Sequence, residues 1–386
     1  MNKKKICILT ISLNMGGAER VISLLLKHLV HDYDVTLVLL SDDIEFDIPE
    51  QVTLHVLGKS NILKNKPPHS KLKSTVMFIY KYYKIVKREK FDIAMSFLAL
   101  PNIINSIIAN YVNHKKTHTV ISERCYPSEM YKQGTFAMKM AKLFYPIFYN
   151  KNDRLFSNSV HINEDLKENF KIKIPMDVIY NPIEISHPKP FKDSYDGSAP
   201  FKIINVGSHS HAKNQELILN ALRTLDTNVS LTILGTGNLT QDLKDYIQTH
   251  HITNDIHMPG KVKNVGEYLL QSDCFVLSSI TEGFPNVLLE AMAIGIPVIS
   301  TNCMSGPLEI LNDNEEVTID DGEFYLAKYG ILINVNDNIA LTKAITFFKD
   351  NDDMRKKYSD LGYKKAKQYD LPEIYKEVKL LLDNEY

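Results

Sequence analysis

The sequence predicts an α/β protein with two doubly wound parallel sheets. Short apolar strands alternate with helical patterns along most of the chain, which is the order of elements in a parallel sheet covered by helices. The chain has 386 residues, more than one ordinary hydrophobic core holds, so we expect two domains. A polar stretch with four prolines, from residue 181 to residue 200, separates the two series of elements and is typical of a linker.

The first series opens with the apolar run Ile6–Ile11 and continues into a helical pattern over Ala18–Leu29. Its further strands are expected at Val35–Leu40, Val52–Leu57, Ile93–Phe97 and Thr119–Ser122. The second series has expected strands at Ile203–Val206, Leu231–Leu234, Ile256–Met258, Phe275–Leu277 and Val298–Ser300, and expected helices at Gln215–Leu225, Leu239–Thr249, Val265–Leu270 and Leu288–Ala293. Two such domains facing each other would place the carboxyl ends of their strands on both walls of a cleft.

The bulk composition is that of a soluble globular protein. Hydrophobic residues make up 44% and charged residues 24%, and the net charge of −1 gives no support for a nucleic-acid partner. The four cysteines lack metal-ligand spacing, and no stretch approaches the ~18 uncharged apolar residues of a spanning helix. We therefore expect a cytoplasmic protein with reduced thiols that can touch a membrane surface. Two Asp-x-Asp triplets, beginning at Asp32 and Asp350, lie in apparent turns, and we expect no metal or other cofactor.

The segment from Ser278 to Ala293 is the most informative part of the chain. A buried strand ends at two serines, a loop with glycine and proline follows, and a helix begins. Glu282 and Glu290 are separated by seven residues, with the new helix N-terminus between them. Carboxylates accept hydrogen bonds from sugar hydroxyls, while N–H groups at a helix N-terminus hold an anion. A sugar nucleotide has both features, although a capped turn with a solvated Glu282 gives the same pattern.

This segment resembles the Glu-x7-Glu signature of the retaining family 4 glycosyltransferases, which have the two-domain GT-B fold. The match continues through Gly295–Thr301 and Ser305–Leu311. The resemblance implies transfer of a hexose or N-acetylhexosamine from a nucleoside-diphosphate donor, most commonly UDP, to a glycan or polyprenyl-diphosphate-linked acceptor in the assembly of capsule, lipopolysaccharide or a similar polysaccharide. It also implies an acceptor domain at residues 1–181, a linker at 182–200, a donor domain at 201–365, and a helix at 366–386 that packs back on the first domain.

The resemblance assigns the donor site residue by residue. Glu282 and Lys213 are the expected catalytic residues, because Glu282 orients the transferred sugar and Lys213 offsets the charge of the departing diphosphate. Glu290 is expected to grip the ribose. The loop and helix start between the two glutamates are expected to contact the sugar and the phosphates through Gly283, Phe284, Pro285, Asn286, Val287 and Leu288.

Three further segments complete the expected donor site. Gly16 and Gly17 follow the first strand and open a helix, where relatives bring the phosphates close to the backbone. Ser208 stands where the family usually has an arginine, so one fixed positive charge is missing. Val262 and Lys263 follow a short strand, and their backbone is expected to read the nucleotide base.

Other motifs in this half of the chain have ordinary interpretations. His209 and His211 are expected to be solvated loop histidines, although a protonated imidazole could assist the diphosphate. Gly235-Thr236-Gly237 looks like part of a dinucleotide fingerprint, but it lacks the third glycine and is expected to be a plain turn.

The acceptor is expected to contact Arg20, Glu123 and Arg124. Ser122-Glu123-Arg124 occupies a place where many relatives have a histidine, and this variant resembles transferases that build lipid-linked oligosaccharides. Arg124 could hold an acceptor phosphate, and a structural role for Glu123 and Arg124 is the alternative.

Two helical stretches bear on membrane contact. Residues 64–90 are rich in lysine and interleaved with aromatic residues, a composition that fits either an anionic lipid surface or a solvated helix with an aromatic core stripe. The stretch Met130–Tyr149 is more apolar and is expected to belong to the core.

Two other functions share parts of this pattern. A UDP-sugar epimerase has the same two-domain fold and would isomerise the donor without an acceptor. A non-catalytic subunit of glycan assembly is motivated by the missing arginine at Ser208.

Overall fold

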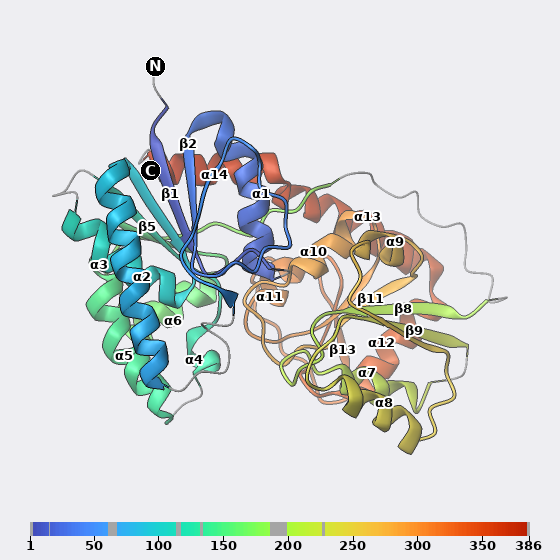
Figure 1. Cartoon of the computed structure of the whole chain (residues 1–386). Coiled ribbons are helices and arrows are strands. Elements are labelled where there is room, and N and C mark those ends of the chain that lie inside the picture. Colours follow the sequence, from blue (N-terminus) through green and yellow to red (C-terminus); the bar gives the residue numbers. More distant parts are fainter. Residues whose placement is uncertain are drawn as a thin grey trace. The chain divides into compact units, whose positions relative to one another are not determined.

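The computed structural model describes residues 3–14, 16–60, 68–112, 117–131, 134–185, 199–225 and 228–383, with no side chains described at 68–71 and 109–112. It divides into two compact units, shown in Figure 1. Unit 1 comprises Met1–Pro182 and Leu371–Tyr386, and unit 2 comprises Ile183–Asp370. Met15, residues 61–67, which include the first four residues of the basic stretch, and residues 186–198 of the predicted linker lie outside the described residues.

Unit 1 is built on a parallel sheet with the strand order β3-β2-β1-β4-β5-β6-β7 in the part of the chain that is described. Its strands are β1 (Lys5–Thr10), β2 (Asp34–Leu39), β3 (Thr53–Val56), β4 (Ile93–Phe97), β5 (His118–Glu123), β6 (Arg154–Ser157) and β7 (Met176–Val178). Its helices are α1 (Gly17–Asp32), α2 (Pro68–Glu89), α3 (Ala99–Val112), α4 (Pro127–Met130), α5 (Phe136–Tyr149), α6 (Val160–Phe170) and α14 (Leu371–Asp383).

Helices cover both faces of this sheet, because both sets of side chains on its central strands are apolar. On β1, Ile6 and Ile8 join a buried cluster with α1 and α14, while Cys7 and Leu9 join a second cluster with α2 and α3. Successive side chains of a strand point to opposite faces, so a strand without polar alternation must be covered twice.

Helix α14 comes from the far end of the described chain and packs on α1. Tyr375 Oη donates to Asp32 Oδ2 and Lys379 Nζ donates to Asp32 Oδ1, both at 2.6 Å. These two hydrogen bonds, from Lys379 first and then Tyr375, hold the pKa of Asp32 below its usual range. Asp32 belongs to one of the Asp-x-Asp triplets, and here it ties two helices together.

Unit 2 repeats the architecture with the strand order β10-β9-β8-β11-β12-β14-β13 among the described residues. Its strands are β8 (Phe201–Val206), β9 (Val229–Leu234), β10 (Ile256–Gly260), β11 (Cys274–Leu277), β12 (Val298–Thr301), β13 (Phe324–Leu326) and β14 (Ile331–Ile333). Its helices are α7 (Gln215–Leu222), α8 (Thr240–Thr249), α9 (Val265–Leu270), α10 (Asn286–Ala293), α11 (Pro307–Asn312), α12 (Asn338–Asp350) and α13 (Asp352–Ala366), followed by the short 3-10 turn η2 (Lys367–Tyr369).

One strand of unit 2 departs from the predicted parallel pattern. The edge strand β13 pairs antiparallel with β14, and a short connection joins the two. A short connection permits only antiparallel pairing, because a parallel neighbour needs a crossover of a dozen or more residues.

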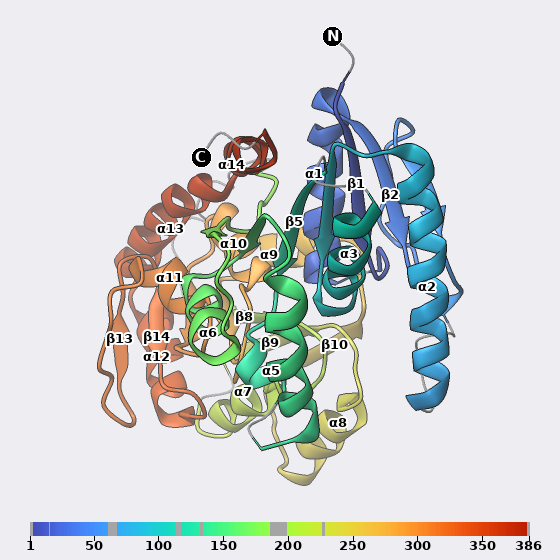
Figure 2. The same cartoon turned by 90° about the vertical axis from the view of Figure 1, so that its left-hand side faces the viewer.

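The prediction that the stretch Met130–Tyr149 belongs to the core is wrong for one face of it. On α5, Met138, Ala141, Tyr145 and Tyr149 are buried, but Phe136, Leu143, Phe144 and Ile147 are exposed. The helix is apolar on both faces, so its sequence has the composition of a buried helix although one face is uncovered. Figure 2 shows α5 and α2 on either side of α3, against which both helices pack. Among the described residues, no helix combines the length and the apolar character needed to cross a bilayer.

Candidate active site

The predicted catalytic residues lie on loops that leave two neighbouring strands of unit 2. Lys213 follows β8 and Glu282 follows β11, and these strands pair side by side. Strand β8 pairs with β9 on one side and with β11 on the other, so the chain builds the sheet outward in opposite directions from the boundary between β8 and β11. Loops at the carboxyl ends of such strands diverge and form the ligand-binding crevice of an open α/β sheet.

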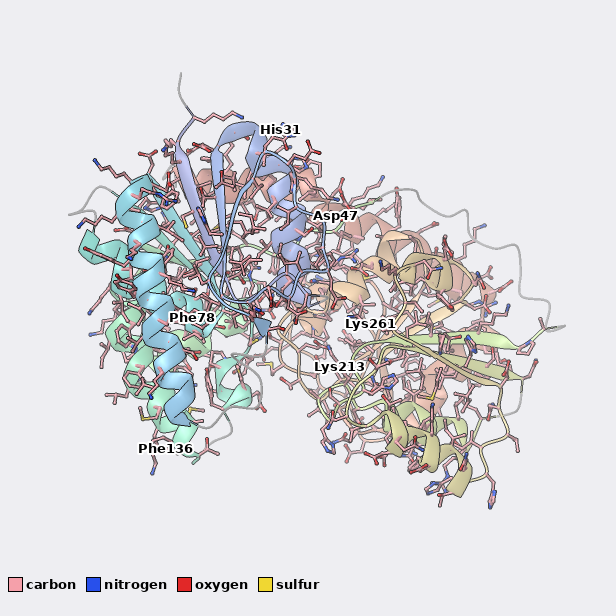
Figure 3. All side chains as sticks on the ribbon, viewed as in Figure 1. His31, Asp47, Phe78, Phe136, Lys213 and Lys261 are labelled. Atoms are coloured by element: carbon pink, nitrogen blue, oxygen red, sulfur yellow. The ribbon has the colours of Figure 1, made fainter. Side chains whose placement is uncertain are left out.

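The two loops bring Lys213 and Glu282 into direct contact. Lys213 Nζ donates to Glu282 Oε1 at 2.5 Å and to Oε2 at 2.7 Å. The side chain of Lys213 is 26% exposed and that of Glu282 is 8% exposed, so the pair is accessible mainly from the lysine side. An ammonium group paired with a carboxylate in this way can move to a diphosphate when one arrives, and the carboxylate is then available for hydroxyls. Figure 3 marks Lys213.

Two buried serines, which the sequence motif did not mark as functional, position this pair. Ser278 Oγ donates to the carbonyl oxygen of Lys213 at 2.8 Å, and Ser279 Oγ donates to Glu282 Oε1 at 2.6 Å. Both residues are fully buried. The pattern of a strand ending in Ser-Ser just before the glutamate was the available signal. Ser278 therefore fixes the backbone that carries the cation, and Ser279 fixes the orientation of the carboxylate.

The loop that carries Glu282 is also tied to the loop after β12. Glu282 N–H donates to Met304 O at 2.8 Å, and Ser305 N–H donates to Glu282 O at 2.9 Å. Gly306 has φ +103°, and a Cβ there would lie 2.6 Å from Cδ of Pro285. Only glycine allows this close approach and this backbone conformation without strain. The start of the segment Ser305–Leu311 therefore packs against the loop that carries Glu282 and supports it.

Helix α10 begins at Asn286, two residues before the predicted start at Leu288, and two residues at its start offer no N–H group to a ligand. Pro285 is its N-cap and has no N–H group, and the N–H of Leu288 donates to Pro285 O at 3.0 Å. Neither Pro285 nor the N–H group of Leu288 is therefore available to hold an anion in this structure. Glu290 lies on the same helix and is partly exposed.

The loop after β8 has a different environment from the one that we predicted. Ser208, which stands where the family usually has an arginine, is exposed. His209 is buried rather than solvated, with Nδ1 2.9 Å from Thr240 Oγ1. Its burial, with a smaller effect of Lys244, lowers the pKa of His209, which favours the neutral imidazole.

The Gly235–Gly237 turn supports the same loop. A Cβ at Gly235 would lie 2.0 Å from the carbonyl oxygen of Gly207, and one at Gly237 would lie 2.2 Å from that of His209. The two glycines allow backbone to pack on backbone, which supports the interpretation of this motif as a structural turn.

The remaining donor residues are spread over both units. Val262 and Lys263 follow β10 in unit 2, with Val262 partly buried and Lys263 exposed. Gly16 and Gly17 are in unit 1, where Gly16 is the N-cap of α1. Arg20 is in the first turns of the same helix, and its N–H donates to Gly16 O at 3.0 Å.

Glu123 and Arg124 lie at the carboxyl end of β5 and are both buried. Tyr149 Oη donates to Glu123 Oε2 at 2.8 Å, and Arg124 Nη1 donates to Asn181 Oδ1 at 2.8 Å. The guanidinium of Arg124 also lies over the rings of Phe97 and Phe156, at 5.2 and 4.7 Å. Burial raises the pKa of Glu123 to about 7 and lowers that of Arg124 to about 9. These contacts support the structural alternative that the sequence left open.

Comparison with known proteins gives matches over nearly the whole chain. A family model described as "Glycosyltransferase Family 4" matches residues 15–187, and one described as "Glycosyl transferases group 1" matches residues 191–365. A relative from Campylobacter jejuni, named N-acetylgalactosamine-N,N'-diacetylbacillosaminyl-diphospho-undecaprenol 4-alpha-N-acetylgalactosaminyltransferase, is 30% identical over 96% of this chain and 97% of its own. A second relative from that organism, an alpha-1,4-N-acetyl-D-galactosaminyltransferase also named for an undecaprenol-linked substrate, is 24% identical over 97% of this chain and 96% of its own.

A solved structure has the same fold. The Anabaena protein HepE, in complex with UDP and glucose, matches with a TM-score of 0.76 over 98% of this chain and 99% of its own, at 16% identity. The predicted fold class, with two Rossmann-like parallel-sheet domains, is therefore confirmed.

Proposed function

This chain belongs to glycosyltransferase family 4 and is a glycosyltransferase, and from that premise we propose that it is a retaining enzyme that uses a UDP-sugar. The transferred group in this proposal is an N-acetylhexosamine or a hexose. The acceptor is a glycan carried on a polyprenyl diphosphate, and the enzyme works in the cytoplasm with a peripheral contact on the membrane.

The contact between Lys213 and Glu282 is the observation that carries this proposal. Transfer breaks the bond between the anomeric carbon and the diphosphate and forms a bond to an acceptor oxygen, so negative charge grows on the departing diphosphate. Lys213 is the cation at this switch point, and Ser278 fixes its backbone before a ligand binds. Positive charge that is already in position stabilises such a transition state, because little reorganisation is needed. The proposal therefore gives Lys213 the diphosphate and Glu282 the hydroxyls of the transferred sugar.

The choice of donor and acceptor is supported by the relatives. Both Campylobacter jejuni relatives are named as N-acetylgalactosaminyl transferases with undecaprenol-linked substrates, and they match nearly all of this chain. HepE was solved with UDP and glucose. Because of these names, UDP-N-acetylhexosamines should be tested as donors before UDP-hexoses.

Binding and transfer assays test the proposal in two steps. A thermal-shift series with UDP, GDP, UDP-N-acetylgalactosamine, UDP-N-acetylglucosamine and UDP-glucose should show selective stabilisation by a uridine nucleotide, about 2.7 kcal/mol at 100 times the dissociation constant. The selected donor is then incubated with a short-chain polyprenyl-diphosphate disaccharide, and the anomeric configuration of the product is read by NMR.

Retention of the donor configuration supports the proposal, and inversion contradicts it. Stabilisation by a guanosine nucleotide alone contradicts the choice of UDP. Deuterium incorporation into the donor sugar in heavy water, without an acceptor, would instead indicate the epimerase. Lys213→Ala is the matched control for every transfer assay.

A further inference from the structure

We propose that the outer faces of α5 and α2 form a docking surface for an anionic lipid bilayer, with α5 lying in the interface. We define this lipid-facing surface by Phe136, Leu143, Phe144 and Ile147 on α5 and by Leu72, Val76 and Tyr80 on α2. It deepens the proposed function, because an enzyme with a lipid-linked acceptor must reach the surface in which that lipid is embedded.

Helix α5 is apolar on the side that nothing in the described structure covers. Phe136 is 77% exposed, Leu143 53% and Ile147 45%. These three residues are seven and four positions apart, which places them on one side of a helix, opposite the buried Met138, Ala141, Tyr145 and Tyr149. A helix that is hydrophobic all round is normally buried in a core or in a membrane.

The length of α5 decides how it meets the membrane. It has 14 residues, whereas a spanning helix needs about 20. Its inner face is also occupied, because Tyr145 stacks on Tyr149 with ring centroids 4.4 Å apart. The helix therefore lies parallel to the surface and buries only its outer face in the boundary between head groups and acyl chains.

The outer face of α2 adds a second apolar stripe. Leu72, Val76 and Tyr80 are four positions apart and are 67%, 58% and 55% exposed. Both α2 and α5 pack against α3, and Figure 2 shows them on the same flank of unit 1. Figure 3 marks Phe136 at the end of α5. Two stripes on one flank give a surface rather than an isolated hydrophobic residue, and exposed apolar surfaces of this kind mark interaction sites.

The charge of the surface selects an anionic bilayer as its occupant. Helix α5 contains Lys139 and Lys142, both exposed, and no acidic residue. The described side chains of α2 include four lysines and Arg88, against Glu89 as the one acid, and Arg88 is paired with that acid. Basic residues around an apolar stripe are the composition of interfacial helices, and each contributes attraction to anionic lipid.

A vesicle-flotation experiment tests the proposal. The wild-type chain should float with vesicles of equal parts phosphatidylcholine and phosphatidylglycerol, and not with phosphatidylcholine alone. Combined Phe136→Asp and Leu143→Asp should reduce the bound fraction at least about tenfold, because two charges would enter the apolar boundary. Combined Lys139→Glu and Lys142→Glu should also reduce it about tenfold on anionic vesicles.

A matched control is Ile339→Asp on α12, since Ile339 is 58% exposed but lies in unit 2. It should float like the wild type. Wild type that stays off anionic vesicles, or a Phe136→Asp, Leu143→Asp variant that floats normally, overturns the proposal. A dimer in sedimentation that Leu143→Asp dissociates overturns it too, because the occupant is then a second copy.

Failure of the docking surface can be distinguished from failure of the proposed function. Leu143→Asp should keep wild-type transfer to a water-soluble acceptor without a lipid tail, because Leu143 is not a residue of the candidate site. Vesicle binding without transfer would overturn the proposed donor chemistry alone, and transfer without vesicle binding would overturn the docking surface alone.

Discussion

Two pairs of charged residues, one in each unit, show how differently the same kinds of side chain can be used. Lys213 and Glu282 are 69 residues apart in sequence, bond directly to each other, and keep the cation partly exposed. Glu123 and Arg124 are neighbours in sequence, but their side chains bond to Tyr149 and Asn181 and are buried.

The two pairs differ in accessibility, and under the proposed function this difference separates a pair that meets the substrate from one that supports the fold. A partly exposed ammonium group can exchange its carboxylate for a ligand phosphate. A buried guanidinium that lies over two aromatic rings would lose those contacts by doing so. We therefore expect changes at the first pair to act on transfer and changes at the second to act on stability.

Loss of Lys213 should give the largest effect. In the proposed mechanism Lys213 meets the departing diphosphate, so Lys213→Ala should lower kcat about 10²–10³-fold. The thermal midpoint should fall modestly, because the largely buried Glu282 loses its ammonium partner but keeps the hydrogen bond from Ser279. Turnover is measured at saturating UDP-sugar, with Lys213→Arg as the matched control that keeps the charge. Near-wild-type turnover of Lys213→Ala would contradict the expectation that changes at Lys213 and Glu282 act on transfer.

The pH dependence of stability should report on Glu123. Burial raises its pKa in the folded chain from 4.5 to about 7, so the folded state holds this proton more tightly than the unfolded state. Its contribution is complete below about pH 4.5 and is lost as the pH rises through about 7. Glu123→Gln removes this titration and should be more stable than wild type near pH 8, by on the order of 3 kcal/mol.

Urea unfolding of both proteins at a series of pH values measures this difference. Tyr149→Phe, which removes the hydroxyl donor to Glu123, is the control for a simple loss of a hydrogen bond. Parallel stability profiles for wild type and Glu123→Gln would show that Glu123 is ionised in the folded chain, and would make it available as an acceptor ligand.

Ser279 should have an intermediate effect, because it orients a catalytic group without touching substrate. Ser279→Ala removes the hydrogen bond to Glu282 Oε1, and kcat should fall about tenfold. Ser279→Thr keeps the hydroxyl and should recover part of the activity. A change in the Km for the donor with kcat unchanged would contradict an orienting role, since the loss would then be one of uniform binding.

Ser208 should give the smallest effect, and a favourable one. Ser208→Arg restores the positive charge that the family usually has at this exposed position, and kcat/Km should rise about fivefold. Ser210→Arg, in the same loop, is the matched control. The same gain from both variants would indicate a general effect of charge rather than a contact with the diphosphate.

Much of the fold could be predicted from the sequence, because alternation of apolar strands and helices is a local property. Strands β6, β7, β13 and β14 were not predicted, because each has only three or four residues and carries little periodic signal. The equally short β11 and β12 were predicted because they adjoin the Glu-x7-Glu segment. The exposure of α5 could not be predicted either. Its outer and inner faces are equally apolar, and a sequence does not record which face other elements cover.

The residues of the candidate site could be predicted where their spacing within one segment determines their relative positions. Glu282 and Glu290 belong to a single loop and helix, so their spacing of seven residues identifies them. The hydrogen bonds of His209 and Ser278 reach segments 31 and 65 residues away, so they are tertiary contacts that the sequence does not record. The hydrogen bond from Ser279 to Glu282 is local, but it depends on the rotamers of both side chains.

Helix α14 has a consequence for how this chain is made. Its residues Leu371, Ile374, Tyr375, Val378, Leu381 and Leu382 complete the hydrophobic cluster of unit 1, yet the ribosome delivers them only after the whole of unit 2. Unit 2 can fold as soon as its own residues have been synthesised, whereas the apolar face of α1 stays uncovered until α14 has been made. The unit that begins first in translation is therefore the one that finishes last.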